Sequence, residues 1–246
     1  MPVANEEATM QSVIDEIMHL PYDELYLYPV IDSYSKDKTE EIIRNSERKY
    51  QNRVKCIFHE GSTGVISCYL YGFKCALDDG AERVIEMDGG GSHDPRELPR
   101  FIKALDKGYD CVWGSRFVKG GGMTHHPLYR RMLSGGGTFL ANFVLGTRLK
   151  DMTSGYEAFQ AHVLKNLRLD NFLSSGHMYQ TEMRFYCRRC RCIEVPIHYT
   201  GGSSSLRWKS VAEALKILFM LKENENNVVI DRSFRKRRTP AAAGRK

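Results

Sequence analysis

Three polar side chains follow apolar segments in the first half of the sequence, and each is of a type that binds phosphate, sugar or metal. Asp32 ends the segment ELYLYPVID, Asp88 ends RVIEMD and Arg116 ends YDCVWGSR. Carboxylates hold hard divalent cations and accept hydrogen bonds from the edge of a base, whereas a guanidinium holds a phosphate through two parallel hydrogen bonds. Together these residue types indicate chemistry on a ligand that carries phosphate.

These residues need a scaffold that brings them together. The strand-like segments alternate with helical patterns in EEATMQSVIDEIMHL, KTEEIIRNSERKY, GVISCYLYGFKCALDD and PRELPRFIKALDK. Such alternation predicts an α/β fold with a mostly parallel sheet flanked by helices, in which ligands bind beyond the carboxyl ends of the strands. We therefore expect the three polar residues at one edge of that sheet.

The second half of the sequence is less regular. It predicts a helix with a glycine interruption in PLYRRMLSGGGTFLANFVLG, a turn in DMTSGYEAF, a helix in YQTEMRFYCRR, a strand in RCIEVPIHY and an amphipathic helix in KSVAEALKILFMLK. We expect one domain over residues 1–231, in which residues 1–116 bind the nucleotide and residues 117–231 shape the acceptor side.

Composition excludes several classes of protein. The sequence contains no run of about 18 apolar residues, so we expect no transmembrane helix. The N-terminus lacks the pattern of a signal peptide. Seven cysteines without regular spacing favour a reducing compartment, so we expect a cytoplasmic protein, possible also at the membrane periphery. Three of these cysteines, in CRRCRC, do not predict a zinc site, because no fourth ligand lies nearby in the sequence.

The basic character of the chain lies in its C-terminal segment. The net charge is +6, and residues 232–246 hold seven Lys or Arg and no acidic residue, which leaves about −1 for the rest (+6 − 7). This pattern predicts a disordered tail. An alternative is a tether to anionic lipid headgroups or to nucleic acid.

Six segments in order resemble the family-two glycosyltransferases. They are PVANEE, VIDSYSKDKT, EMDGGGSHDP, VWGSR, DMTSGYEAF and GHMYQTEM. The resemblance covers roughly residues 2–221 and is strongest to the branch with dolichol-phosphate mannose synthase and polyprenyl-phosphate glycosyltransferases. It implies a GT-A fold, a Rossmann-like sheet that holds a nucleotide-diphosphate sugar. The implied activity is inverting transfer of a hexose from a GDP-mannose or UDP-glucose type of donor to a polyprenyl (dolichyl-type) phosphate.

On the donor side, the resemblance implies a set of nucleotide-binding residues, which are Pro2, Ala4, Glu6, Asp32, Asp88, Gly89 and Gly90. The first strand that carries Pro2 is either short or trimmed. Asp32 would accept hydrogen bonds from the base.

The implied metal site is incomplete. The family usually has Asp-X-Asp at Asp88, and this pair holds a divalent cation on the diphosphate, here Mg²⁺ or Mn²⁺. Gly90 replaces the second Asp. Metal binding would then depend on Asp88, the diphosphate and water, with help from Ser92, His93 or Asp94. We expect the adjacent glycines to leave room for sugar and metal.

On the acceptor side, the resemblance implies that arginines hold a phosphate and that a polar turn and a helix line the sugar pocket. These residues are Arg116, Arg130, Arg131, Asp151, Thr153, Ser154, Gly155, Gln180 and Glu182. Asp88, Arg116, Arg130 and Glu182 would carry the catalysis. Glu157 stands where the polyprenyl-phosphate branch often has Arg.

Two further functions remain open at this point. The acceptor could be a hydroxyl of a glycan, a small molecule or a hydroxymethylated DNA base, which requires a base such as Glu182 or Asp151. Alternatively, the chain binds a nucleotide without catalysis, and only Gly90 favours that interpretation. The sequence does not indicate the oligomeric state.

Overall fold

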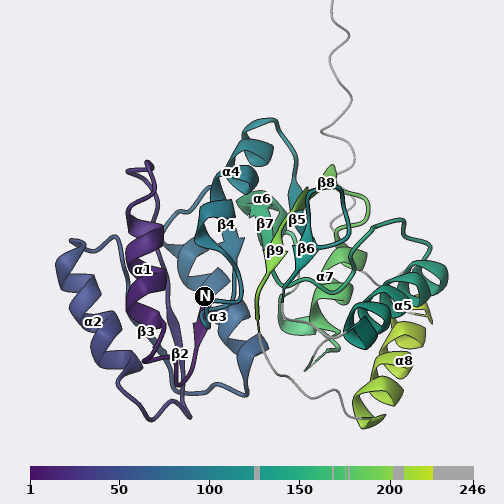
Figure 1. Ribbon diagram of the computed structural model, residues 1–246, viewed down its shortest axis with the longest axis horizontal. Helices are drawn as coiled ribbons and strands as arrows, with labels where there is room; N and C mark the ends of the chain where they lie inside the picture. The colour runs from purple at the N-terminus through teal and green to yellow at the C-terminus, as the bar shows by residue number, and fades with distance from the viewer. Residues whose placement is uncertain (125–127, 168, 175, 177, 202–207, 224–246) are drawn as a thin grey trace, which may run out of the picture.

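A computed structural model describes residues 1–124, 128–167, 169–174, 176, 178–201 and 208–223. Three parts lie side by side in Figure 1: a small sheet with its helices on the left, a larger sheet in the centre and a helical pair on the right. The first two parts share one apolar core that runs from α1 to the central strands, and the helical pair has a core of its own.

The left-hand sheet is parallel throughout. Its strands, in spatial order, are β1 (Pro2–Val3), β2 (Val30–Asp32) and β3 (Ile57–His59). The helices around it are α1 (Met10–Met18), α2 (Thr39–Lys49) and α3 (Val65–Asp78). The apolar face predicted for α1 is confirmed, because all of its members are buried: Met10, Val13, Ile14, Ile17 and Met18.

The central sheet contains a strand that the sequence analysis missed. Its spatial order is β4 (Arg83–Glu86), β7 (Glu157–Gln160), β5 (Cys111–Ser115) and β8 (Cys192–Pro196). β7 is antiparallel to β4 and β5, whereas β5 and β8 are parallel. The prediction of a turn through DMTSGYEAF was therefore wrong from Glu157 onward. The first three residues of β7 are all buried, so the segment shows no alternation of apolar and polar residues.

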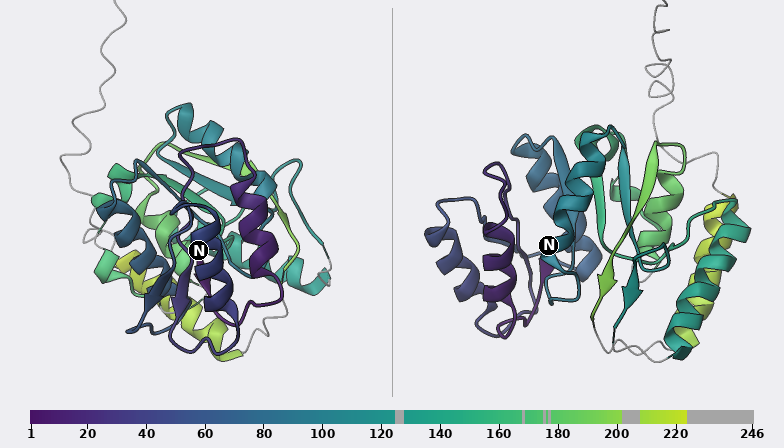
Figure 2. Two further views of the ribbon diagram at one scale, coloured as in Figure 1. Left: turned by 90° about the vertical axis from the view of Figure 1, so that its left-hand side faces the viewer. Right: turned by 45° about the horizontal axis from the view of Figure 1, so that its top comes forward.

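Short elements complete the fold, and two views in Figure 2 show how they surround the sheets. They are η1 (Pro95–Glu97), α4 (Leu98–Asp106), α6 (Ala161–Lys165), η2 (Leu169–Asn171), α7 (Tyr179–Tyr186) and a two-stranded parallel sheet of β6 (Gly122–Met123) and β9 (His198–Tyr199). An isolated bridge between His93 and Tyr199 places β9 beside the segment that follows β4.

The helical pair consists of α5 (Leu128–Leu145) and α8 (Trp208–Glu223), which pack on each other through Ala141, Leu145, Ile217, Leu218 and Leu221. The glycine run at 135–137 does not interrupt α5, contrary to the sequence prediction. No helix in the described ranges has the length and apolar character needed to cross a membrane.

The strands present the three polar residues as the sequence predicts. Asp32 is the last residue of β2, Arg116 follows the last residue of β5, and Asp88 comes two residues after the end of β4. The expectation of an α/β fold with a mostly parallel sheet is thus confirmed, with β7 as the antiparallel exception.

Candidate functional site

Asp88 is held in place by two hydroxyl groups and remains accessible. The Tyr69 hydroxyl, from the first turns of α3, donates to Oδ1 at 2.6 Å, and the Ser92 hydroxyl donates to Oδ2 at 3.1 Å. The Asp88 side chain is 36% exposed. A carboxylate that is oriented in this way and still faces solvent can bind a cation or a polar ligand.

His93 lies beside this carboxylate and carries an unused hydrogen-bond donor. The Asp88 backbone N–H donates to Nδ1 at 3.0 Å, which places the proton of a neutral imidazole on Nε2. Burial lowers the pKa of His93 and favours this neutral form, although the charge of Asp88 acts in the opposite direction. Nε2 is buried, lies 3.7 Å from Asp88 Oδ2 and has no hydrogen-bond partner among the described residues.

The glycines after Asp88 make room for the protein itself, which corrects the expectation that they make room for sugar and metal. A Cβ atom at Gly89 would lie 2.4 Å from Val3 Cγ1 and 2.7 Å from the Pro2 carbonyl oxygen. A Cβ atom at Gly90 would lie 2.8 Å from Glu6 Oε1. The segment therefore crosses the end of β1 in close contact, which only glycine permits at Gly89.

The first strand brings three predicted donor residues to this crossing. Pro2 is buried in β1 and pairs with Val30 of β2, and Ala4 follows half-buried. Glu6 lies against Gly90, and the Thr9 hydroxyl donates to its Oε2 at 3.3 Å. Burial raises the pKa of Glu6, and the nearby charges of Asp37 and Asp88 raise it further, against the effect of the Thr9 hydrogen bond.

Asp32 is almost completely buried, with 2% of its surface exposed. The Ser62 hydroxyl donates to Oδ1 at 2.5 Å, and the Tyr34 backbone N–H donates to the same oxygen at 3.4 Å. Oδ2 has no hydrogen-bond partner among the described residues. This oxygen is suited to accept a hydrogen bond from a base, and a base can reach it only if the atoms that cover it move.

The polar turn before β7 faces Asp88. A Cβ atom at Gly155 would lie 3.3 Å from Gln180 Nε2. It would lie 3.7 Å from both Asp88 Oδ1 and His93 Cε1. The structure thus brings three separate segments together, and each carries a residue predicted for the site: Asp88, Gly155 and Gln180. His93 was named only as a helper.

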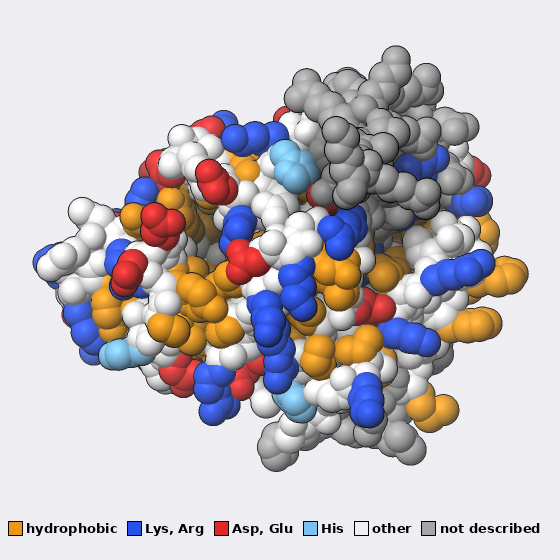
Figure 3. Space-filling model, turned by 90° about the horizontal axis from the view of Figure 1, so that it is seen from above, with side chains coloured by type: hydrophobic (Ala, Val, Ile, Leu, Met, Phe, Trp, Pro, Cys, Tyr) orange, Lys and Arg blue, Asp and Glu red, His pale blue; other side chains and the backbone are white. Residues whose placement is uncertain are grey.

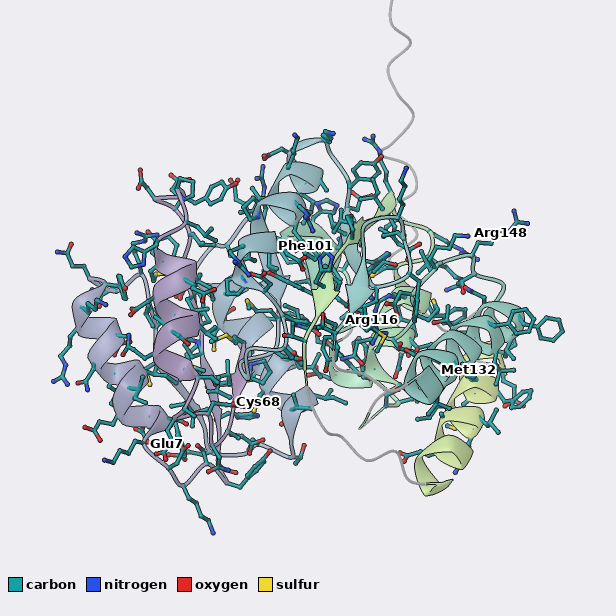
Figure 4. All side chains as sticks on the ribbon, viewed as in Figure 1. Glu7, Cys68, Phe101, Arg116, Met132 and Arg148 are labelled. Carbon is teal, nitrogen blue, oxygen red and sulfur yellow. The ribbon has the colours of Figure 1, made fainter. Side chains whose placement is uncertain are left out.

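Arg116 forms an ion pair with the buried carboxylate of Asp151. Its Nε donates to Asp151 Oδ2 at 2.7 Å and its Nη2 donates to Oδ1 at 2.8 Å, while the backbone N–H of Arg116 donates to Oδ2 at 3.0 Å. Burial acts to raise the pKa of Asp151, but the Arg116 guanidinium outweighs it and holds that pKa below the ordinary value. Figure 4 shows Arg116 near the centre of the molecule, between the central sheet and α5.

A hydroxyl pair connects this arginine to α5. Arg116 Nη2 also donates to Thr153 Oγ1 at 2.6 Å and to Ser134 Oγ at 3.1 Å. The Nη1 atom forms no hydrogen bond to a described residue and is not among the buried unpaired atoms. Arg130 and Arg131 lie in the first turn of α5, but their side chains fall outside the described part of the chain.

Glu182 has a structural role in its contacts. It is fully buried in α7, and its two oxygens accept hydrogen bonds from the backbone N–H groups of Leu173 and Ser174 at 2.8 Å each. The Tyr186 hydroxyl adds a third at 2.5 Å. These contacts fix the loop before α7, and they occupy both oxygens of Glu182.

Two residues that sequence reasoning did not pair form a buried ion pair behind the site. Glu157 of β7 contacts Arg184 of α7, and neither side chain is exposed. Arg184 also donates to the Ser154 carbonyl oxygen at 2.8 Å, and this bond connects α7 to the polar turn before β7. The unusual acid at position 157 is therefore explained by its partner in α7, which no local motif indicates.

The cysteine cluster gains a fourth member in the structure. Cys111 of β5 is the register partner of Cys192 and interacts with Cys187 and Cys190. Within the described ranges, however, no group of three or more His, Cys, Asp or Glu side chains is arranged to hold a metal ion. A cation at Asp88 would therefore need oxygen ligands from the diphosphate, which is how Mg²⁺ commonly binds.

Residues 1–168 match the family described as Glycosyl transferase family 2. An undecaprenyl-phosphate mannosyltransferase of Micrococcus luteus is 38% identical over 157 residues, which cover 62% of this chain and 64% of that protein. A polyprenol monophosphomannose synthase of Mycolicibacterium smegmatis is 30% identical over 220 residues (87% and 82%). A dolichol-phosphate mannosyltransferase of Pyrococcus furiosus is 28% identical over 233 residues (93% and 64%). The chain thus spans less than two thirds of the first and third of these relatives.

Solved structures agree on the fold. Glucosyl-3-phosphoglycerate synthase of Mycobacterium tuberculosis with uridine diphosphate aligns with a TM-score of 0.64 at 17% identity, over 90% of this chain and 78% of that one. Its complex with Mn²⁺, uridine diphosphate and phosphoglyceric acid aligns with a TM-score of 0.65 at 18% identity, over 94% and 78%. At this identity the likeness concerns the fold alone, and it confirms the expected GT-A architecture.

Proposed function

Because the chain belongs to glycosyl transferase family 2, we propose that it transfers a hexose from a nucleotide-diphosphate sugar to a polyprenyl phosphate. The observation that carries this proposal is the group formed by Asp88, the unpaired Nε2–H of His93, Gly155 and Gln180. A carboxylate and a buried donor next to a glycine, which adds no side chain of its own, suit a sugar diphosphate. The relatives are named for mannosyl transfer, which favours a donor of the GDP-mannose type.

The donor half would bind the nucleotide along the strand ends. Asp32 Oδ2 would accept a hydrogen bond from the base, and the His93 Nε2–H would donate to a phosphate oxygen. A divalent cation, Mg²⁺ or Mn²⁺, bound at Asp88 would neutralise charge on the leaving nucleoside diphosphate. Asp88 fits this role, because its carboxylate is oriented by two hydroxyls and accessible.

The acceptor half favours a phosphate over a hydroxyl. Inversion is a single displacement: an acceptor phosphate oxygen forms a bond to the anomeric carbon while the bond from that carbon to the diphosphate breaks. A phosphate is already ionised near neutral pH and needs no general base, whereas a hydroxyl does. Both candidate bases are occupied, Asp151 by Arg116 and Glu182 by two backbone N–H groups. Arg116 Nη1 would meet the phosphate.

The surface beside Arg116 suits a lipid. Ser134, which hydrogen-bonds Arg116, lies on α5, and the same helix exposes 72% of Phe139 and 80% of Phe143. The neighbouring α8 exposes 58% of Phe219. Figure 3 shows apolar side chains protruding at the right-hand edge, the side of α5 in Figure 1, beside Lys and Arg side chains. We infer that this face enters the bilayer interface that holds the polyprenyl acceptor.

A direct test compares acceptors and donors in one assay. Purified protein is given labelled GDP-mannose or UDP-glucose with a short-chain polyprenyl phosphate, with the corresponding polyprenol, or with no acceptor. We expect label in the lipid phosphate product only, and loss of that product in Arg116→Ala. Transfer to the polyprenol, or donor binding without transfer in any arm, would replace this proposal with one of the alternatives.

A further inference from the structure

Glu6 occupies the space that a side chain at position 90 would need. A Cβ atom built on Gly90 would lie 2.8 Å from Glu6 Oε1 and 3.2 Å from both Cδ and Oε2. The Glu6 carboxylate therefore lies in contact with the position that a side chain at Gly90 would take. The sequence lacks the second carboxylate of the Asp-X-Asp pair at Gly90, and the structure places another carboxylate at the same point from the loop before α1.

The surroundings of Glu6 hold its backbone firmly and leave one carboxylate oxygen free. The Glu6 backbone N–H donates to Thr39 Oγ1 at 2.8 Å, and its carbonyl oxygen accepts from the N–H groups of Thr9 and Met10 at the start of α1. In the carboxylate, Oε2 accepts from the Thr9 hydroxyl, and Oε1 accepts no hydrogen bond from a described residue.

The charges around Glu6 are of the same sign. The charged groups near the Glu6 carboxylate include two further carboxylates, those of Asp37 and Asp88. No ion pair to Glu6 is formed within the described ranges. Nearby carboxylates without a cationic side chain between them lose their mutual repulsion when a divalent cation binds to both.

An independent observation shows that a ligand belongs here. The His93 side chain is 1% exposed, and its Nε2 lies 3.7 Å from Asp88 Oδ2 and has no hydrogen-bond partner among the described residues. An unpaired buried donor is rare, because it loses its hydrogen bond to water without replacement. A phosphate oxygen beside Asp88 would satisfy it, which places a diphosphate and its cation at the same carboxylate.

We propose that Glu6 supplies the second carboxylate of the donor cation site, in place of the side chain missing at Gly90. The inference rests on the proposed function, since the cation is the one that accompanies the diphosphate. Asp88 and Glu6 would provide one oxygen ligand each, and diphosphate oxygens and water would complete the coordination. An aspartate at position 90 would bring a second carboxylate into contact with that of Glu6, so one of the two side chains would have to move.

The test measures Mn²⁺ binding by electron paramagnetic resonance, with GDP or UDP present, so that activity is not the readout. We expect Glu6→Gln to weaken Mn²⁺ binding at least tenfold. Glu7→Gln is the matched control, because Glu7 is the next residue, carries the same charge and is exposed (Figure 4); its Mn²⁺ affinity should stay within about twofold. Thermal unfolding checks that each variant is folded, and Glu6→Ala, which also removes the carboxylate, replaces Glu6→Gln if the latter is not.

A carboxylate swap makes the test specific. Gly90→Asp alone should bind Mn²⁺ no better than the native chain, because two carboxylates compete for one space. Glu6→Ala should weaken binding, and the double variant Glu6→Ala/Gly90→Asp should restore it to within about threefold of the native affinity. Native affinity in Glu6→Gln would overturn the proposal, as would a double variant that binds no tighter than Glu6→Ala.

The failure of this inference is distinguishable from the failure of the proposed function. If neither GDP nor UDP binds with or without Mn²⁺, the proposed function fails. If a nucleotide binds and the Mn²⁺ affinity is the same in the native chain and in Glu6→Gln, the proposed function stands. Glu6 is then a neighbour of the cation site and not a ligand.

Discussion

Arg116 and Asp151 form a buried, two-pronged ion pair that fastens the end of β5 to the turn before β7. Both guanidinium contacts are shorter than 3 Å, and the backbone N–H of Arg116 adds a third bond to the same carboxylate. Removing one member of such a pair leaves an uncompensated charge in the interior.

Asp151→Asn should therefore destabilise the fold by about 3–5 kcal/mol in urea unfolding. The matched control is Asp106→Asn, which breaks the exposed pair of Asp106 with Arg83 and should cost about 0–1 kcal/mol. Equal losses in the two variants would show that the Arg116 pair is no more than a surface contact.

Arg116→Lys should separate acceptor binding from donor binding. Lysine keeps the charge beside Asp151 but presents a single point of contact instead of a planar fork. We expect KM for a polyprenyl phosphate to rise about tenfold or more, while the Kd for the nucleotide is unchanged. An equal loss of nucleotide affinity would contradict the acceptor-side placement of Arg116.

Asp32→Asn should weaken nucleotide binding by about ten- to a hundredfold, because the variant loses a charged acceptor for the base. Thermal shift or calorimetric titration with GDP and UDP measures this loss, and Asp23→Asn, at an exposed position, is the control. Nucleotide affinity that survives in Asp32→Asn would place the base elsewhere.

Glu86→Gln should change how stability depends on pH. Glu86 and Glu157 are cross-strand partners with one unpaired oxygen each, so a proton held between them would satisfy both. Burial, followed by the charge of Glu157, raises the pKa of Glu86 well above its ordinary value, and burial raises the pKa of Glu157 to about 7 from 4.5.

Raised carboxyl pKa values mean that the folded protein keeps protons that the unfolded chain releases. Stability is then greatest below pH 4.5 for these groups and is lost as the pH rises through about 7. We expect the melting temperature of the native chain to fall between pH 5 and pH 8 relative to Glu86→Gln. About 1 kcal/mol corresponds to roughly 2–4 °C in a chain of this size. Glu40→Gln, at an exposed helix position, should show no such difference.

Phe139→Ser and Phe143→Ser should each lower binding to lipid vesicles about tenfold, since each removes an aromatic side chain from the bilayer interface. Sedimentation with phosphatidylcholine vesicles that contain phosphatidylglycerol measures the effect. Phe58→Ser is the control, because Phe58 is exposed on β3, in the sheet that lies away from α5. If all three variants bind equally, the α5 face does not meet the membrane.

The sequence predicts much of the fold and part of the candidate site. Helices α1 to α4 and the strands that end near Asp32, Asp88 and Arg116 follow from periodicity, since each carries its own apolar pattern. The family and the GT-A fold were also predicted and are confirmed. β7 was missed, because a short strand buried on both faces has no pattern of its own.

The remaining differences depend on contacts between distant segments. The glycines at 89 and 90 looked like space for a ligand, but Val3 and Glu6 fill that space from 80 or more positions away in the sequence. The pairing of Glu157 with Arg184 and the engagement of Glu182 with the backbone of Leu173 are likewise invisible to local motifs. The roles predicted for the individual site residues stay predictions.

β7 is hydrogen-bonded on both sides, to β4 and to β5. The turn that leads into it touches Arg116 through Asp151 at one end and borders Asp88 through Gly155 at the other. A shift of one residue in the register of this four-residue strand would turn Glu157 away from Arg184. The same shift would displace both Asp151 from Arg116 and Gly155 from Asp88. A single strand register thus sets the distance between Arg116 and Asp88, on which the proposed acceptor and donor sites depend, and this loop should tolerate insertions and deletions poorly.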